Sequence, residues 1–290
     1  MTGGTSQSLS KITKSILNQY GIKLNKNLGQ NYLIDKNKRD QIIGFGNINK
    51  DDVVLEIGTG IGTLTIEIAK RAKKVIAIEQ DRGISDILAQ RLKDEKIDNV
   101  ELINDDALKV EFPKFNKIVS NLPYQISSPI TFKFLDYDFD LAVLMYQKEF
   151  ADRMNGEVST KNYSRLSAML YFKCDVLKLT DVSAESFLPK PEVDSTVVCL
   201  KPKETRIPEE DFNFYSKITK ALFQHRNKKI RNALIDSRHV FCSLDKKEMK
   251  KRLNSIEDER LEDYLKKRVV MLTPEEILFL SKEINEILRE

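Results

Sequence analysis

The segment SNLPYQ, residues 120–125, brings together residue types that can hold an aromatic amine. The Asn121 side-chain carbonyl and the Leu122 backbone carbonyl are two hydrogen-bond acceptors, the proline that follows fixes a bend, and Tyr124 presents a flat ring. An amine on an aromatic ring is a poor nucleophile because its lone pair is delocalised. Two acceptors and a stacked tyrosine would aim such a nitrogen at a bound electrophile by positioning rather than through a strong base.

A glycine-rich segment, EIGTGIGTLT at residues 56–65, is typical of a strand-to-helix turn that approaches a ligand closely. Gly58 and Gly60 match the first two glycines of the dinucleotide-binding pattern G-x-G-x-x-G, but the third glycine comes one residue early. This departure argues against a nicotinamide dinucleotide and favours a nucleoside without a pyrophosphate. The same turn could also be purely structural.

Two acidic residues extend this pattern. Glu79 ends the next apolar run, 21 residues after Gly58, close to the spacing of about 20 at which an acid meets ribose hydroxyls in nucleotide-binding α/β proteins. Asp106 follows the third run and could accept a hydrogen bond from the amino group of a nucleobase. Open α/β sheets bind ligands at the carboxyl ends of their strands, so we expect both acids beside the glycine turn. The alternative that Asp106 only caps a turn remains open.

The elements that must position these residues are short apolar runs that alternate with segments of helical period. This alternation predicts an α/β fold with a parallel sheet covered on both faces. The expected strands are residues 53–57, 75–79, 100–103, 117–120, 141–146, 174–182 and 195–202. The connection FLPKPEVD between the last two is too long for a tight hairpin, which suggests that it reaches a site.

The strand pattern stops after Pro202, and only segments of helical period follow it. These are residues 209–224, 226–235, 245–253, 258–266 and 274–289. We therefore expect three parts: a mobile basic arm at residues 1–29, an α/β domain at 30–204 and an all-α domain at 205–290.

Basic residues are concentrated toward the end of the chain. Lys and Arg outnumber Asp and Glu by 48 to 44, and the excess lies in residues 201–290, which hold 21 basic and 17 acidic residues. The acid-free stretch 212–235 contains Arg226, Lys228, Lys229 and Arg231. Such a stretch predicts contact with a polyanion such as RNA, although a solvated helix face is the plain alternative.

Composition excludes several classes of protein. With 41% apolar and 32% charged residues, the chain suits a soluble globular protein. No run approaches the ~18 uninterrupted apolar residues that cross a bilayer, and the amino terminus lacks the pattern of a secretory signal. Three cysteines are too few and too scattered for a disulfide framework or a CxxC metal site. We therefore expect a cytoplasmic protein with neither a metal nor a membrane contact.

Together these segments resemble the S-adenosylmethionine-dependent ribosomal-RNA adenine N6,N6-dimethyltransferases over most of the chain. NLPY is similar to the target-amine motif of that family and is the most specific match, and GTGIG is similar to its glycine turn. LGQNYLID (28–35), FLPKPEVDS (187–195) and FQHRNKKIRNAL (223–234) resemble its amino-terminal, downstream and basic motifs. The resemblance implies a Rossmann-like class I methyltransferase domain, followed by a small all-α domain that helps to grip RNA.

The resemblance also implies roles for individual residues. Contacts to the cofactor S-adenosylmethionine are implied for Asn31, Leu33, Gly58, Gly60, Glu79, Asp106 and Asn121. Asn121 and Leu122 would orient the N6 amine of an adenine that has left its stack. Tyr124 and Phe187 would hold the base between them. RNA contacts are implied for Arg226, Lys228, Lys229 and Arg231.

The helical part resembles the branch that dimethylates two adjacent adenines in a hairpin near the 3′ end of small-subunit rRNA. That branch implies a monomer that acts on the pre-ribosomal small subunit during ribosome biogenesis. Methylation of a single adenine in large-subunit rRNA is the first alternative, because the same motifs would serve it. The second is a non-catalytic RNA-binding assembly factor, which would have no use for the glycine turn, Glu79 and NLPY together. The early glycine disfavours a nicotinamide oxidoreductase.

Overall fold

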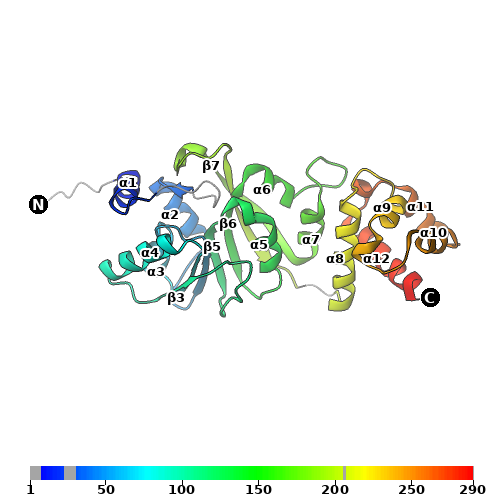
Figure 1. Cartoon of the computed structure of the whole chain (residues 1–290), viewed down its shortest axis with the longest axis horizontal. Helices are drawn as coiled ribbons and strands as arrows, with labels where there is room; N and C mark the ends of the chain where they lie inside the picture. The colour runs from blue at the N-terminus through cyan, green and yellow to red at the C-terminus, as the bar shows by residue number, and fades with distance from the viewer. Residues whose placement is uncertain (1–7, 23–30, 205–206, 290) are drawn as a thin grey trace, which may run out of the picture. The chain divides into compact units, whose positions relative to one another are not determined.

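The computed structural model describes residues 8–22, 31–204 and 207–289 (Figure 1). The chain divides into two compact units. The first contains the described residues up to Ala151 together with Val176–Pro202, and the second contains Asp152–Asp175 and the chain from Lys203 onward. The boundary expected at residue 204 therefore does not capture the excursion of residues 152–175 into the second unit. None of the described helices combines the length and apolar character that crossing a lipid bilayer requires.

A seven-stranded sheet forms the first unit, in the order β4-β3-β2-β5-β6-β9-β7. The pairs from β4 to β6 are parallel, and β9 pairs with β6 in the antiparallel direction. The predicted α/β fold with a parallel sheet is thus confirmed. The strands are β2 (Val53–Ile57), β3 (Lys74–Glu79), β4 (Val100–Asn104), β5 (Lys117–Asn121), β6 (Leu141–Gln147), β7 (Cys174–Val182) and β9 (Ser195–Pro202).

Short helices connect these strands, and a small second sheet lies beside them. The helices are α2 (Lys36–Phe45), α3 (Thr65–Ala69), α4 (Arg82–Asp94), α5 (Ser127–Phe134) and α6 (Lys148–Met154). β1 (Tyr32–Leu33) pairs antiparallel with β8 (Phe187–Leu188). The start of the FLPKPEVD connection therefore lies against the segment that precedes α2.

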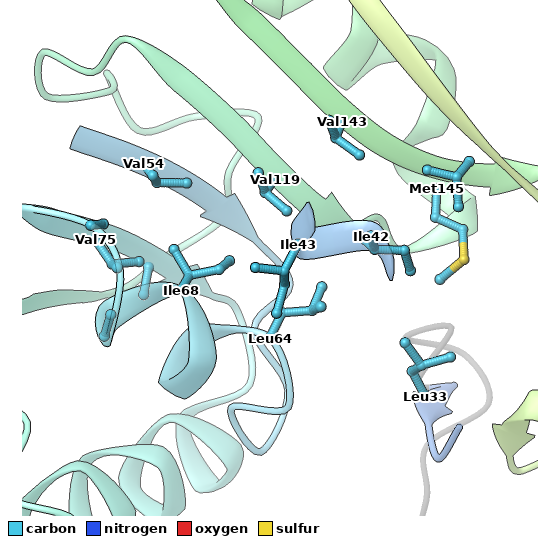
Figure 2. Packing of buried hydrophobic residues seen from close by; sticks show 14 of the residues in the cluster. Leu33, Ile42, Ile43, Val54, Leu64, Ile68, Val75, Val119, Val143 and Met145 are labelled. Carbon is cyan, nitrogen blue, oxygen red and sulfur yellow. The ribbon is translucent and has the colours of Figure 1, made fainter. Parts of the chain in front are cut away.

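One apolar layer of the core of the first unit lies between the sheet and the helices α2 and α3 (Figure 2). Alternate side chains of a strand point to the same face, so neighbouring parallel strands contribute valines to one continuous layer. The cluster includes Val54, Val75, Val119, Val143, Ile42, Ile43 and Ile68. Each of these side chains is at most 2% exposed, which fixes the strands and hence the residues at their carboxyl ends.

The amino-terminal arm is helical over part of its length, so the prediction of a mobile arm is wrong for α1 (Leu9–Gln19). The Ser8 side chain caps its first turn. Leu17 packs in an apolar cluster with Tyr32, Ile61 and Ile84. The helix was not predicted because the interpretation of this segment rested on its lysines. The helical spacing of the apolar residues at positions 12, 16 and 17 was not used. Residues 1–7 and 23–30 lie outside the described residues.

The second unit is all-helical. Its elements are α7 (Arg165–Lys173), α8 (Glu209–Phe223), α9 (Ile230–Asp236), α10 (Lys246–Asn254), α11 (Glu259–Lys266) and α12 (Pro274–Arg289). Two buried tyrosines attach residues 152–175 to it: the Tyr163 hydroxyl donates to the Leu272 carbonyl at 2.7 Å, and the Tyr215 hydroxyl donates to the Ala168 carbonyl at 2.8 Å. α9 begins four residues later than expected, because residues 224–227 form a turn and Lys229 forms an isolated β-bridge with Arg268.

A buried polar network closes the amino ends of β2 and β5, opposite the edge where ligands bind in such sheets. The Lys117 ammonium donates to Asp52 at 2.9 Å and to the Asn47 carbonyl at 2.6 Å. The Asn116 amide and the Asn49 N–H also donate to Asp52, at 2.8 and 2.7 Å. Burial alone would raise the pKa of Asp52, but these hydrogen bonds and the lysine hold that pKa below its usual range.

Lys117→Met tests this network. The substitution leaves Asp52 buried without its cation, so we expect the free energy of unfolding at pH 7 to fall by about 3–5 kcal/mol, measured by urea denaturation. Because the folded-state pKa of Asp52 is lowered, the contribution of this network is present at neutral pH and is lost as the pH falls below about 3.9. The difference between wild type and variant should therefore narrow toward pH 3.

The matched control is Lys74→Met, which removes a lysine from an ion pair with Glu101 in which both side chains are more than 40% exposed. We expect it to change stability by less than about 1 kcal/mol. An equal loss in both variants, or a Lys117→Met difference that is independent of pH, would contradict this account of the network.

Candidate active site

A cavity lies at the carboxyl edge of the sheet and is lined by the ends of β2, β3 and β5, by the loop after β4 and by β1. It brings together nine of the site residues expected from the sequence. These are Asn31, Leu33, Gly58, Gly60, Glu79, Asp106, Asn121, Leu122 and Tyr124. Phe187 is the one expected member of the catalytic and cofactor sets that does not line it.

The glycine turn after β2 is held against the segment after β5. Gly58 has a φ of +71°, and a Cβ at this position would lie 2.8 Å from Cγ and Cδ of Pro123. Both the left-handed backbone and the close approach require glycine here. Gly60, with a φ of +54°, faces the ring of Tyr32 in the same way. The turn thus joins the two motifs that sequence reasoning placed at one edge.

Glu79 at the end of β3 is tied into the turn. One carboxylate oxygen accepts the Gly60 N–H at 2.9 Å, and the other accepts the Asp81 N–H at 3.0 Å. Burial raises the pKa of Glu79, and the nearby Asp81 carboxylate adds to this, while the backbone N–H groups oppose it. A carboxylate has about four lone-pair positions, so two N–H donors leave acceptor capacity for hydroxyl groups of a ligand.

Asp106, in the loop after β4, is partly exposed and lines the cavity. One of its oxygens accepts the Leu108 N–H at 3.0 Å, so it does cap a turn, and the other lies 3.5 Å from the Lys109 ammonium. The loop is also fixed by Lys133, whose ammonium donates to the Ala107 carbonyl at 2.9 Å. The two readings of Asp106 are therefore compatible, because a capping carboxylate retains lone pairs toward the cavity.

Asn121 has a defined orientation at the end of β5. Its amide nitrogen donates to the Asn31 carbonyl at 3.2 Å, and its side-chain oxygen has no partner within the described ranges. The amide thus leaves an acceptor, and not a donor, unpaired beside the cavity. The Leu122 backbone carbonyl is also without a backbone partner in the described part of the chain. These are the two acceptors that the sequence predicted.

Tyr124 and Phe187 lie in different environments. The Tyr124 hydroxyl is hydrogen bonded to Ser195 Oγ at 2.6 Å, which fixes the ring at the cavity wall, and burial raises the pKa of this hydroxyl. Phe187 is 2% exposed and belongs to the apolar cluster that contains Leu33 and Met145. Phe187 does not line the cavity, and the pairing of β8 with β1 places it beside Leu33 in the core, so its contact with a base stays a prediction.

Sequence reasoning assigned no role to two buried polar residues of the cavity wall. Glu56 is 1% exposed, and one of its carboxylate oxygens has no hydrogen-bond partner among the described residues. Burial raises the pKa of Glu56 to about 8, so the carboxyl is largely protonated at neutral pH. The Tyr32 hydroxyl is also buried without a partner in those residues. The sequence signal that could have identified them is their position: Glu56 lies two residues before Gly58, and Tyr32 directly follows Asn31.

Three of the four basic residues expected to contact RNA bind the protein itself, all within the second unit. Arg226 donates to the Lys161 and Thr160 carbonyls at 2.8 and 2.9 Å. Lys228 pairs with Asp236 at 2.9 Å, and Arg231 pairs with Glu262. Lys229, at the N-cap position of α9, is exposed, and no ion pair is formed by its ammonium within the described ranges.

Comparison with known proteins places this geometry in a family. The family described as "ribosomal RNA adenine dimethylase" matches residues 21–270. Among its relatives, a probable ribosomal RNA small subunit methyltransferase A from Methanosphaera stadtmanae is 49% identical over 95% of this chain and 97% of the relative. A protein of the same description from Pyrococcus abyssi is 46% identical over 95% of this chain and 96% of the relative.

Solved structures agree with this match. A dimethyladenosine transferase from Plasmodium falciparum is similar with a TM-score of 0.71 and 32% identity, over 87% of this chain and 97% of that structure. The 23S rRNA methyltransferase ErmE has a TM-score of 0.63 and 25% identity, over 88% of this chain and all of that structure. The predicted Rossmann-like class I methyltransferase fold is thus confirmed. With the family matched over most of its length, this chain belongs to the ribosomal RNA adenine dimethylases.

Proposed function

We propose that this enzyme transfers methyl groups from S-adenosylmethionine to the N6 amines of two adjacent adenines in a hairpin near the 3′ end of small-subunit rRNA. One observation carries the proposal. The acceptors of Asn121 and Leu122, which have no partner among the described residues, line the same cavity as the glycine turn and Glu79. The small-subunit assignment is supported by the relatives, which are described as small-subunit methyltransferases at 46–49% identity.

The cavity fits the cofactor. Gly58 and Gly60 let the turn pack against Pro123 and Tyr32 at the cavity wall, and Glu79 retains acceptor capacity for the ribose hydroxyls. Asp106 would accept from the adenine amino group, and Asn31 and Leu33 would form the opposite wall together with Asn121. When bound, S-adenosylmethionine supplies a methyl group activated by a positively charged sulfur.

Asn121 and Leu122 would orient the target amine through hydrogen bonds. Because the Asn121 amide nitrogen is held by the Asn31 carbonyl, its oxygen is set to accept one N–H of the target amine, and the Leu122 carbonyl can accept the other. Both hydrogen bonds draw electron density toward the nitrogen and fix its direction. Tyr124 would stack on the base. Phe187 supports this wall from within the core through its contact with the cluster that contains Leu33.

RNA binding is assigned to the second unit, where the net positive charge of the chain lies. Lys229 is the strongest single candidate for a phosphate contact, since Arg226, Lys228 and Arg231 are engaged with the protein. Action on the pre-ribosomal small subunit, by a monomer in the cytoplasm, stays a prediction that rests on the sequence.

Mapping the modified base tests the proposed function. The protein is incubated with radiolabelled S-adenosylmethionine and either small or large ribosomal subunits that lack N6,N6-dimethyladenine. We expect four methyl groups per small subunit, two on each of two adjacent adenines near the 3′ end, located by primer extension and mass spectrometry. Label only in large-subunit RNA would favour the single-adenine alternative. The observation on the side of this alternative is the similarity to ErmE, which is a 23S rRNA methyltransferase. Binding without any transfer would favour a non-catalytic assembly factor.

Asn121→Ala tests the orientation of the amine. Loss of the side-chain acceptor removes one positioned hydrogen bond in the transition state, so we expect kcat for methyl transfer to fall by about 10²–10³. The dissociation constant of S-adenosylmethionine, measured by calorimetry, should change only a few-fold. The control Asn18→Ala removes an exposed amide on α1 and should leave both quantities unchanged. Near-normal turnover of Asn121→Ala would contradict the role of this residue.

A further inference from the structure

The hydroxyl of Tyr32 is a polar atom that has no hydrogen-bond partner among the described residues of the first unit. Tyr32 is 6% exposed and lines the cavity. Its oxygen is buried, and no hydrogen bond is formed to it by any described residue. Buried hydroxyls in native proteins are nearly always hydrogen bonded, because leaving one unpaired is unfavourable. An exception at the wall of a binding cavity points to a group that arrives with the ligand.

The position of this side chain is fixed, so its hydroxyl cannot turn away to find another partner. The backbone of Tyr32 is paired with Leu188 in the antiparallel ladder of β1 and β8. The ring packs in an apolar cluster with Ile61 and Ile84. It also lies against Gly60, where a Cβ would be only 3.0 Å from the ring.

The Tyr32 hydroxyl has an acidic neighbour, Glu79, and its pKa depends on burial and on nearby carboxylates. Burial raises the pKa of Tyr32 above its ordinary value, and the carboxylates of Glu79 and Asp81 raise it further. The phenol therefore remains protonated and can donate a hydrogen bond at any physiological pH. Glu79 accepts the N–H of Gly60, the residue on which the Tyr32 ring packs, so the two side chains border the same part of the turn.

We propose that the Tyr32 hydroxyl and the Glu79 carboxylate together bind the ribose diol of the cofactor, an inference that rests on the proposed function. A ribose hydroxyl is both a donor and an acceptor. It can donate to the carboxylate of Glu79 and accept from the phenol of Tyr32, which satisfies all three groups at once. Tyr32 is thus a binding residue that selects for a hydroxylated sugar, and it takes no part in the chemical step.

Tyr32→Phe removes the hydroxyl and keeps the ring that packs on Gly60. We measure, by calorimetry, the affinity of wild type and variant for S-adenosylhomocysteine and for its 2′-deoxy and 3′-deoxy analogues. We expect the variant to bind S-adenosylhomocysteine about 3- to 10-fold more weakly, as befits one neutral hydrogen bond. For the analogue that lacks the contacted hydroxyl, wild type and variant should bind equally, because the interaction is already absent.

Thermal unfolding of the free protein provides a second measurement. Because no described residue forms a hydrogen bond to this hydroxyl, the free Tyr32→Phe protein should unfold at the same temperature as wild type or higher. Tyr20→Phe, the same change at a residue that is 40% exposed, is the control and should alter neither binding nor unfolding.

Three results would overturn the assignment. They are equal affinity of Tyr32→Phe and wild type for S-adenosylhomocysteine, an equal loss for all three ligands, and a free variant less stable than Tyr20→Phe, which would reveal an internal partner. If wild type binds none of the three ligands, the proposed function fails and the assignment fails with it. Binding by wild type without an effect of Tyr32→Phe overturns the assignment alone.

Discussion

The contact between Gly58 and Pro123 is the constraint on which the site depends. The turn after β2 and the turn after β5 belong to neighbouring parallel strands, and they approach so closely that a methyl group on Gly58 would clash with the proline ring. A methyl donor held by the first turn and an amine held by the second then share one cavity. Because the strands beneath are packed through Val54 and Val119, the distance between the two turns is set by the core.

Buried polar groups are hydrogen bonded at one end of the sheet and partly unpaired, among the described residues, at the other. At the amino ends of the strands, the charge of Asp52 is fully met by Lys117, Asn116 and the Asn49 N–H. At the carboxyl ends, three side chains each keep an atom without a partner among the described residues: a buried oxygen of Glu56, the buried hydroxyl of Tyr32 and the side-chain oxygen of Asn121. The first arrangement stabilises the fold and the second leaves hydrogen bonds to be made by ligands, at a cost to the stability of the free protein.

The sequence predicted the strands well because a strand buried on both faces is a continuous apolar run, and the residues after each run must meet at one edge. Glu79, Asp106 and Asn121 were found by this reasoning. The burial of Phe187 was not predicted, because the pairing of β8 with β1 joins residues more than 150 positions apart. The partners of Arg226 and Arg231 were missed for the same reason, since Lys161 and Glu262 lie 65 and 31 residues away. Local patterns do not encode such pairings.

A double-mutant cycle at Gly58 and Pro123 tests the central claim most directly. Gly58→Ala, Pro123→Ala and the double variant are compared with wild type in kcat/KM for methyl transfer, with Gly44→Ala, which meets no atom within 4 Å, as the control for adding a methyl group. Pro123→Ala removes the atoms that the new methyl group would strike, so we predict that the double variant recovers part of the activity lost in Gly58→Ala. Losses that simply add would mean that the two turns act independently, and this would contradict the account.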